Sequence, residues 1–194
     1  MDAKAELRRH LQAGRDALLW KLEGLSEFDV RRPLTPTGTN LLGLVKHLTF
    51  VELGYFGGVF GRPVPGVQAW MDDDGSEPNW DLWATADEPR AAVEEGYRQA
   101  WAHADTTISS LDLDAAGHVP WWRPDRRDVT LHQVLVQVVA ETHRHAGHAD
   151  IVRELIDGAA GVRADNDNLP DVDPGWWAGY RDRLEQVARE AAGR

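Results

Sequence analysis

Residues 130–158 read TLHQVLVQVVAETHRHAGHADIVRELIDG, and this stretch decides the fold. Its apolar residues recur in steps of three and four, which is typical of the buried face of a packed helix. Thr130 is a favourable N-cap residue and Gly158 a favourable C-terminal residue, so one long helix is predicted over 130–157. The predicted inward positions are Leu131, Val134, Val138, Glu141, His145, His148, Val152 and Leu155. Three consecutive members of this otherwise apolar line are therefore ionisable.

These ionisable groups need a partner if they face the core. An unpaired buried carboxylate is costly, and a buried imidazole needs a hydrogen-bond partner. Glu141 and His145 are four residues apart, so their side chains project from adjacent turns of one helix face. Helical bundles hold metal ions with inward carboxylate and imidazole ligands of this kind. A bound divalent metal ion is the favoured interpretation, and a simple ion pair within the helix is the alternative.

A third ligand has to come from another helix, and His47 is the candidate. It lies in the segment GLVKHLTFVE, where it is surrounded by apolar residues of a helix predicted over 40–57. Taken alone, a histidine such as His47 is more often a hydrogen-bonded core or surface residue than a metal ligand. Two histidines and one glutamate leave a coordination position open, as in catalytic sites. This ligand set favours zinc, with nickel, iron, cobalt and manganese as alternatives.

His148 follows His145 by one turn of the same predicted helix. It is predicted to act near the open coordination position, as a catalytic general base. A fourth metal ligand and a hydrogen-bond partner of a ligand are the alternatives.

The rest of the chain predicts an all-α fold. Further helices are expected over 2–23, 40–57, 88–110 and 173–192, and no segment has a convincing strand pattern. The connection 58–87 is too long for an idle loop, so we expect it to pack over the bundle and line a pocket. The predicted architecture is a four-helix bundle with a long crossover after the second helix and an extra C-terminal helix. We expect one domain over 1–194, with its core in 2–158.

Composition narrows the classes of function. The net charge of −11 argues against a nucleic-acid binder, because phosphate contacts require basic clusters. The same acidity disfavours binding to anionic membrane surfaces. The charged N-terminus lacks the features of a signal peptide, and no apolar run approaches the ~18 residues of a membrane span. A cytoplasmic location is therefore expected. The chain has no cysteine, so any reactive thiol has to arrive on a substrate or cofactor.

Two segments carry a family resemblance: GLVKHLTFVELGYF, residues 43–56, and ETHRHAGHADIVRELIDG, residues 141–158. With them the chain resembles the DinB/YfiT-like superfamily of metal-binding four-helix bundles, over about 5–160. It is most similar to the DUF664 branch, which is similar to the metal-binding domain of mycothiol-dependent maleylpyruvate isomerase. Many DinB proteins use three histidines, the last two in a pattern like HxxxHRG. Here Glu141 replaces the first of that pair, as in the isomerase branch.

The resemblance implies the same crossover in the fold and an activity that uses a low-molecular-weight thiol such as mycothiol or bacillithiol. Eighteen arginines against three lysines fit an actinobacterial source, in which the thiol would be mycothiol. The metal site agrees with such an activity, because a metal with an open position binds a thiol as its nucleophilic thiolate.

The leading hypothesis is a metal-dependent S-transferase that joins a mycothiol-like thiol to a small electrophile. Its metal ligands would be His47, Glu141 and His145, with His148 as the base. A metal-dependent hydrolase and a non-catalytic stress protein that binds metal or ligand are the alternatives. The expected partners are small molecules, with no nucleic acid or membrane. A homodimer is a further expectation, since bundles of this kind often associate through helix faces.

Overall fold

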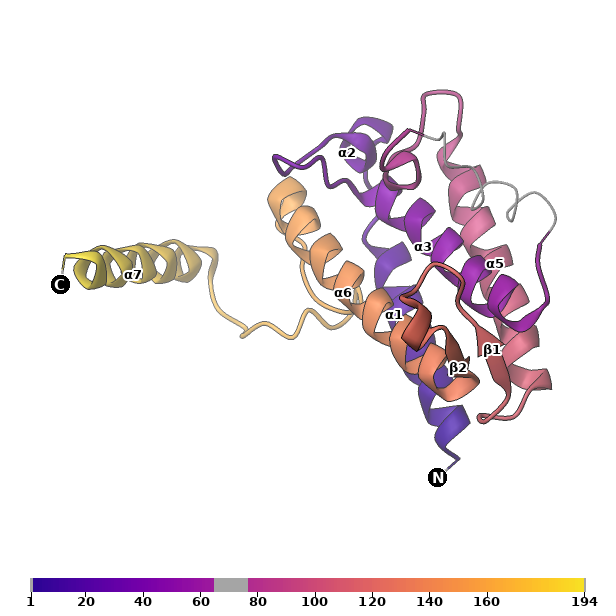
Figure 1. The fold of residues 1–194 in the computed structure, drawn as a ribbon. Coiled ribbons are helices and arrows are strands. Elements are labelled where there is room, and N and C mark those ends of the chain that lie inside the picture. Colours follow the sequence, from indigo (N-terminus) through magenta and orange to yellow (C-terminus); the bar gives the residue numbers. More distant parts are fainter. Residues whose placement is uncertain (1, 65–76, 194) are drawn as a thin grey trace.

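Four long helices lie side by side and form the body of the molecule (Figure 1). The computed structural model describes residues 2–64 and 77–193. The bundle helices are α1 (Ala3–Trp20), α3 (Leu41–Phe56), α5 (Arg90–Ser110) and α6 (Leu131–Asp157). Helix α3 packs against both α5 and α6, and α1 packs against α6. The predicted all-α bundle is confirmed, with helix ends close to the predicted ones.

Side-chain caps explain where these helices begin and end. Asn40 accepts a hydrogen bond from the backbone N–H of Gly43 at the start of α3. Thr130 and Gln133 form a reciprocal capping box at the start of α6. Gly158 ends α6 in the left-handed region, with φ of 81°, where a residue with a Cβ would be strained. Capping residues next to these helix ends therefore set the helix boundaries that the sequence predicts.

The core consists of two apolar clusters, one toward each end of the bundle. Between them, α1 and α6 approach closely at Gly14, where a Cβ would lie 2.9 Å from the Thr142 methyl group. The line predicted to face inward on α6 departs from the core at its far end, because Leu155 is 61% exposed. A straight helix drifts by ~20° per heptad relative to a perfect 3.5-residue repeat. The end of the line therefore turns to solvent at Leu155, whereas Val152 is buried as predicted and Ala149 lies beside it in the core.

A buried ion pair joins α1 to α3. The guanidinium of Arg15 donates to Glu52 from Nε at 2.9 Å, and both side chains are almost fully buried. A second carboxylate, Asp105 of α5, accepts from Arg15 at 3.0 Å. Since a buried charge is tolerated only when it is paired and hydrogen-bonded, Arg15 ties three helices together.

The connections contain short elements that sequence periodicity does not predict. They are α2 (Glu27–Arg31), η1 (Gly58–Phe60), η2 (Trp80–Leu82), η3 (Pro124–Arg126), and the strands β1 (Ala116–His118) and β2 (Asp128–Thr130). The strands pair antiparallel, with Gly117 opposite Val129. Three-residue strands are too short to give an alternating pattern, so this hairpin was not expected.

The described part of the crossover between α3 and α5 packs over the bundle, as predicted. Its η2 turn packs against α3. Trp83, directly after η2, lines a cavity, so the expectation that this connection lines a pocket is confirmed there. Trp70 and the acidic run Asp72–Asp74 lie outside the described residues.

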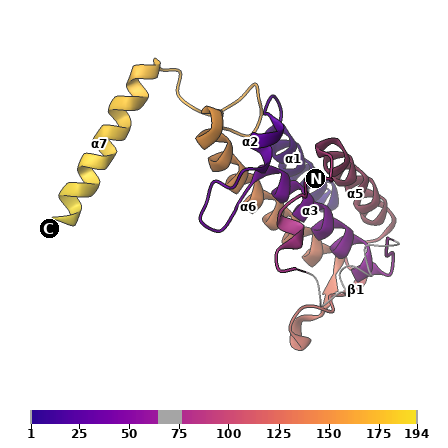
Figure 2. The same cartoon turned by 90° about the horizontal axis from the view of Figure 1, so that it is seen from above.

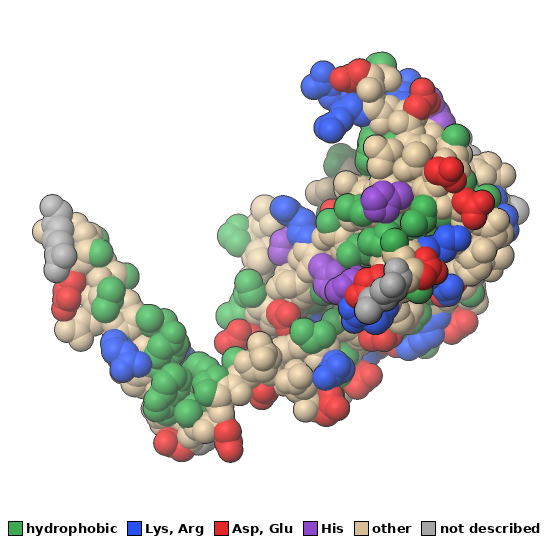
Figure 3. All heavy atoms as spheres, turned by 90° about the horizontal axis from the view of Figure 1, so that it is seen from below, with side chains coloured by type: hydrophobic (Ala, Val, Ile, Leu, Met, Phe, Trp, Pro, Cys, Tyr) green, Lys and Arg blue, Asp and Glu red, His purple; other side chains and the backbone are tan. Residues whose placement is uncertain are grey.

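The predicted C-terminal helix is present as α7 (Pro174–Ala192) and stands apart from the bundle (Figures 1 and 2). The side chain of Asp173 caps it by accepting from Gly175 and Trp176 N–H groups. Hydrophobic side chains gather along this separate helix (Figure 3). Across the described part of the chain, every helix falls short of the length and apolar character that a membrane span requires.

Replacing Arg15 with methionine should strongly destabilise the fold. It leaves the Glu52 carboxylate buried without its cation, which costs about 3–5 kcal/mol of unfolding free energy. Urea denaturation followed by circular dichroism measures this loss. Arg9→Met is the matched control, because Arg9 forms an exposed pair with Glu6 in the same helix. Equal denaturation midpoints for the two variants would contradict the role given to Arg15.

Candidate metal centre

The structure brings together the three residues that the sequence singled out. His47 comes from α3, and Glu141 and His145 come from α6; one potential ligand atom of each lies within 4.8 Å of the others. Glu141 Oε1 is 3.0 Å from His145 Nε2 and 3.6 Å from His47 Nε2. Because two packed helices supply these side chains, their relative positions are fixed by the bundle.

The cluster lies at the edge of the core. The side chains of His47, Glu141 and His145 are 20%, 29% and 13% exposed, respectively. Their α6 neighbours Thr142 and Ala146 are buried more deeply. The three ligand candidates are thus removed from bulk water on one side and reachable by a small molecule on the other.

A hydrogen bond sets the orientation of the His47 ring. Nδ1 of His47 lies 2.6 Å from Oδ2 of Asp81 in η2. An ionised carboxylate only accepts hydrogen bonds, so Nδ1 is the donor, and a neutral His47 ring then has its lone pair on Nε2. Nε2 is buried and has no hydrogen-bond partner among the described residues. A lone pair of this kind, pointing at a carboxylate and a second imidazole, fits a divalent cation.

Asp81 remains ionised in this position. Partial burial by itself raises the pKa of Asp81, but the hydrogen bond from His47 and the electrostatic attraction between the two side chains outweigh that effect and hold the pKa below its ordinary value. A carboxylate behind a metal-ligating histidine fixes the tautomer and increases the basicity of the ring. Asp81 therefore has the geometry of a residue that positions His47.

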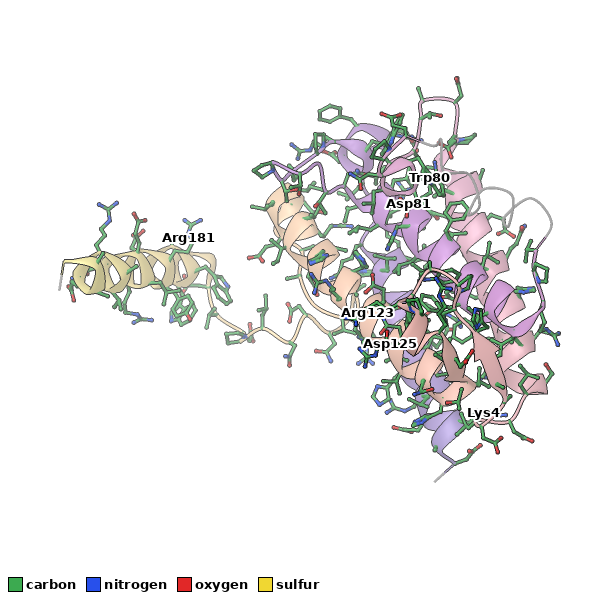
Figure 4. The ribbon with its side chains drawn as sticks, viewed as in Figure 1. Lys4, Trp80, Asp81, Arg123, Asp125 and Arg181 are labelled. Carbon is green, nitrogen blue, oxygen red and sulfur yellow. The ribbon has the colours of Figure 1, made fainter. Side chains whose placement is uncertain are left out.

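A close contact between η2 and α3 places Asp81. The carbonyl of Leu82 lies so near Gly43 that a Cβ on Gly43 would be 1.9 Å from the Leu82 oxygen. Asn40 also donates to this carbonyl from Nδ2 at 3.1 Å. Trp80 and Asp81 accordingly lie beside α3 (Figure 4). Sequence reasoning missed Asp81, and its only signal was a glycine inside the apolar start of a helix.

His145 is in the neutral form that a metal ligand requires. Burial lowers the pKa of His145, and repulsion between this ring and that of His47 when both are protonated lowers it further, whereas Glu141 opposes the shift. The net pKa lies below the ordinary value for histidine, so at neutral pH the imidazole has a lone pair to offer.

His148 contacts the other side of the His145 ring. Its Nδ1 is 3.3 Å from Nδ1 of His145, and both rings line a cavity of about 490 Å³ next to the cluster. If His145 binds a cation through Nε2, the hydrogen of its neutral ring is on Nδ1. Nδ1 of His145 then donates a hydrogen bond to Nδ1 of His148. In that state His148 presents Nε2–H to the cavity. This arrangement favours the hydrogen-bond-partner alternative for His148, and its role as a base stays a prediction.

Asp81→Ala should weaken zinc binding by about 10- to 100-fold, since His47 loses the carboxylate that orients it. Competition with a chromophoric chelator measures the dissociation constant. Asp87→Ala is the control, because Asp87 is an exposed carboxylate in the same connection. Identical affinities for wild type and Asp81→Ala would show that this carboxylate has no part in metal binding.

Gly43→Ala should weaken zinc binding in the same direction without touching any ligand. The new methyl group displaces the Leu82 carbonyl, and Asp81 moves away from His47 with it. The same competition assay applies. Gly96→Ala is the control, because a Cβ at Gly96 in α5 meets nothing within 4 Å. An unchanged zinc affinity in Gly43→Ala would show that the contact between η2 and α3 does not affect the metal centre.

Comparison with known proteins identifies the family of the chain. A family model described as mycothiol-S-transferase matches residues 6–158. The match spans the four bundle helices with the whole cluster and ends at the glycine that closes α6. A search of curated proteins gave no match. Since the matched region covers most of the chain, the protein belongs to the mycothiol-S-transferase family.

Proposed function

We propose that this protein is a metal-dependent S-transferase that joins a mycothiol-like thiol to a small electrophile. The observation that carries the proposal is the buried Nε2 of His47, which has no hydrogen-bond partner among the described residues and faces Glu141 and His145. Family membership supports mycothiol as the thiol. The absence of cysteine from the chain means that the nucleophilic sulfur has to belong to the cosubstrate.

His47, Glu141 and His145 would hold the cation. One carboxylate and two neutral imidazoles suit zinc, and nickel, iron, cobalt and manganese are compatible with the same donors. When bound, a divalent cation lowers the pKa of a thiol so that it is present as thiolate at neutral pH. The three protein ligands leave room for one further group, which is the position proposed for the thiol.

The surrounding residues would prepare the site for this reaction. Asp81 orients His47, and His148 orients His145 while it presents a ring nitrogen to the cavity. Leu44 and Leu82 in the cavity wall limit access of water to the sulfur. Water exclusion strengthens electrostatic interactions within the site and reduces competing hydrolysis.

Zinc-loaded protein should conjugate mycothiol to monochlorobimane, which becomes fluorescent when its chlorine is displaced by sulfur. We expect a chelator to abolish the activity, zinc to restore it, and Glu141→Ala/His145→Ala to reduce it to background. His143→Ala/Glu154→Ala is the matched control, because it removes one histidine and one glutamate from exposed positions of the same helix. Steady-state fluorescence assays give all of these rates.

Other outcomes distinguish the alternative functions. Turnover of an ester or amide that continues without thiol would indicate a metal-dependent hydrolase. Stoichiometric metal without turnover of any electrophile in a broad panel would indicate a binding protein. Conjugation at an undiminished rate in the presence of chelator would contradict metal dependence.

A further inference from the structure

The cavity next to the metal centre has a neutral lining. We call it the neutral cavity; its volume is about 490 Å³, within the range of sites for small organic ligands. Among the described residues, its lining comprises Thr37, Gly38, Thr39, Asn40, Leu44, Asn79, Leu82, Trp83, His145 and His148. This set contains no carboxylate, ammonium or guanidinium group. A charged ligand would find no oppositely charged side chain in this lining, so the cavity favours an uncharged ligand.

Two polar side chains of the neutral cavity are free of hydrogen bonds to the described residues. The side chains of Thr39 and Asn79 make no hydrogen bond to any described residue, whereas the Asn40 amide is fully used in holding α3 and η2. Asn79 has a left-handed backbone, with φ of 64°, at the start of η2. Hydroxyl and amide groups both donate and accept, which matches the hydroxyl groups of a polyol.

Trp83 provides an apolar surface beside these polar groups. It directly follows η2, is 41% exposed and lines the neutral cavity with Leu44 and Leu82. An indole face packs well against the C–H face of a sugar ring, while the ring hydroxyls turn to hydrogen-bonding groups around it. A flat aromatic group beside uncharged donors and acceptors is therefore a surface suited to a carbohydrate.

A second cavity, of about 560 Å³, has the opposite character. Its lining includes Arg123 and Arg126 together with Trp122, Gln133 and Gln137. Guanidinium groups favour anionic ligands. His145 and His148 line the neutral cavity and are not among the residues that line this one. An uncharged glycoside that delivers sulfur to the metal centre thus fits the neutral cavity better.

We propose that the neutral cavity binds the uncharged, polyhydroxylated part of the thiol cosubstrate, with the sugar on Trp83 and the sulfur directed to His145 and the metal centre. This inference rests on the proposed function for its choice of ligand. Mycothiol fits it chemically, because its sulfur belongs to an acylated cysteine attached to an uncharged glycoside. The electrophile then reaches the sulfur from outside this cavity.

The test compares zinc-loaded wild type with Trp83→Ala in conjugation assays that vary each substrate in turn. Losing the stacked indole should raise the KM for mycothiol by about tenfold. The KM values for N-acetylcysteine, which lacks the glycoside, and for monochlorobimane should stay at wild-type levels. Trp176→Ala is the matched control, because Trp176 is 40% exposed and lies on the separate helix α7. Metal content and circular dichroism establish that both variants are folded and loaded.

Asn79→Gly gives a second, independent variant. Glycine keeps the left-handed backbone of Asn79 and removes only its amide, so the KM for mycothiol should rise without a change in stability. An unchanged mycothiol KM in both variants would overturn the inference. A rise in the KM for monochlorobimane instead would assign the neutral cavity to the electrophile and overturn it as well.

Calorimetric titration with S-methylated mycothiol separates this inference from the proposed function. Binding to wild type that is weakened by Trp83→Ala supports the glycoside site even if no conjugate forms. Active wild type that shows no preference for mycothiol over N-acetylcysteine would leave the S-transferase function standing and refute the glycoside site.

Discussion

The hydrogen bond from His47 Nδ1 to Asp81 determines which nitrogen of the ring faces Glu141 and His145. In the neutral ring this places the lone pair on Nε2, which is buried and has no hydrogen-bond partner among the described residues. A polar atom in this state costs free energy until something accepts its lone pair. A divalent cation would do so, and it would also neutralise the Glu141 carboxylate between the two imidazoles. Metal binding would then be coupled to the stability of the helices that supply the ligands.

The bundle separates the rigid part of the site from the part that is proposed to bind the cosubstrate. Helices α3 and α6 supply the candidate ligands, and the buried pair of Arg15 and Glu52 fixes α3 against α1. The loops around Thr39 and Trp83 line the neutral cavity. Packed helices hold a metal geometry well, while loops on such a frame adapt more readily to an organic ligand. One contact joins the two parts, because the Leu82 carbonyl against Gly43 sets the position of Asp81.

Sequence reasoning succeeds where the information is local. Helix periodicity and the caps at Thr130 and Gly158 define α6, and polar interruptions of apolar faces identify the three residues that converge. It fails where information is long-range. Asp81 belongs to a crossover whose path has no periodic signal, and the partner of Arg15 lies 37 residues away. The neutral cavity combines three segments of chain, so its lining and volume emerge only when these segments pack.

The most direct test of this account is elemental analysis of purified protein beside the Glu141→Ala/His145→Ala double variant. Both proteins should first be shown by circular dichroism to have the same helix content. The account predicts a stoichiometric divalent metal in the wild type and background levels in the double variant. Equal metal content in the two proteins would contradict it, because the cation would then be held elsewhere.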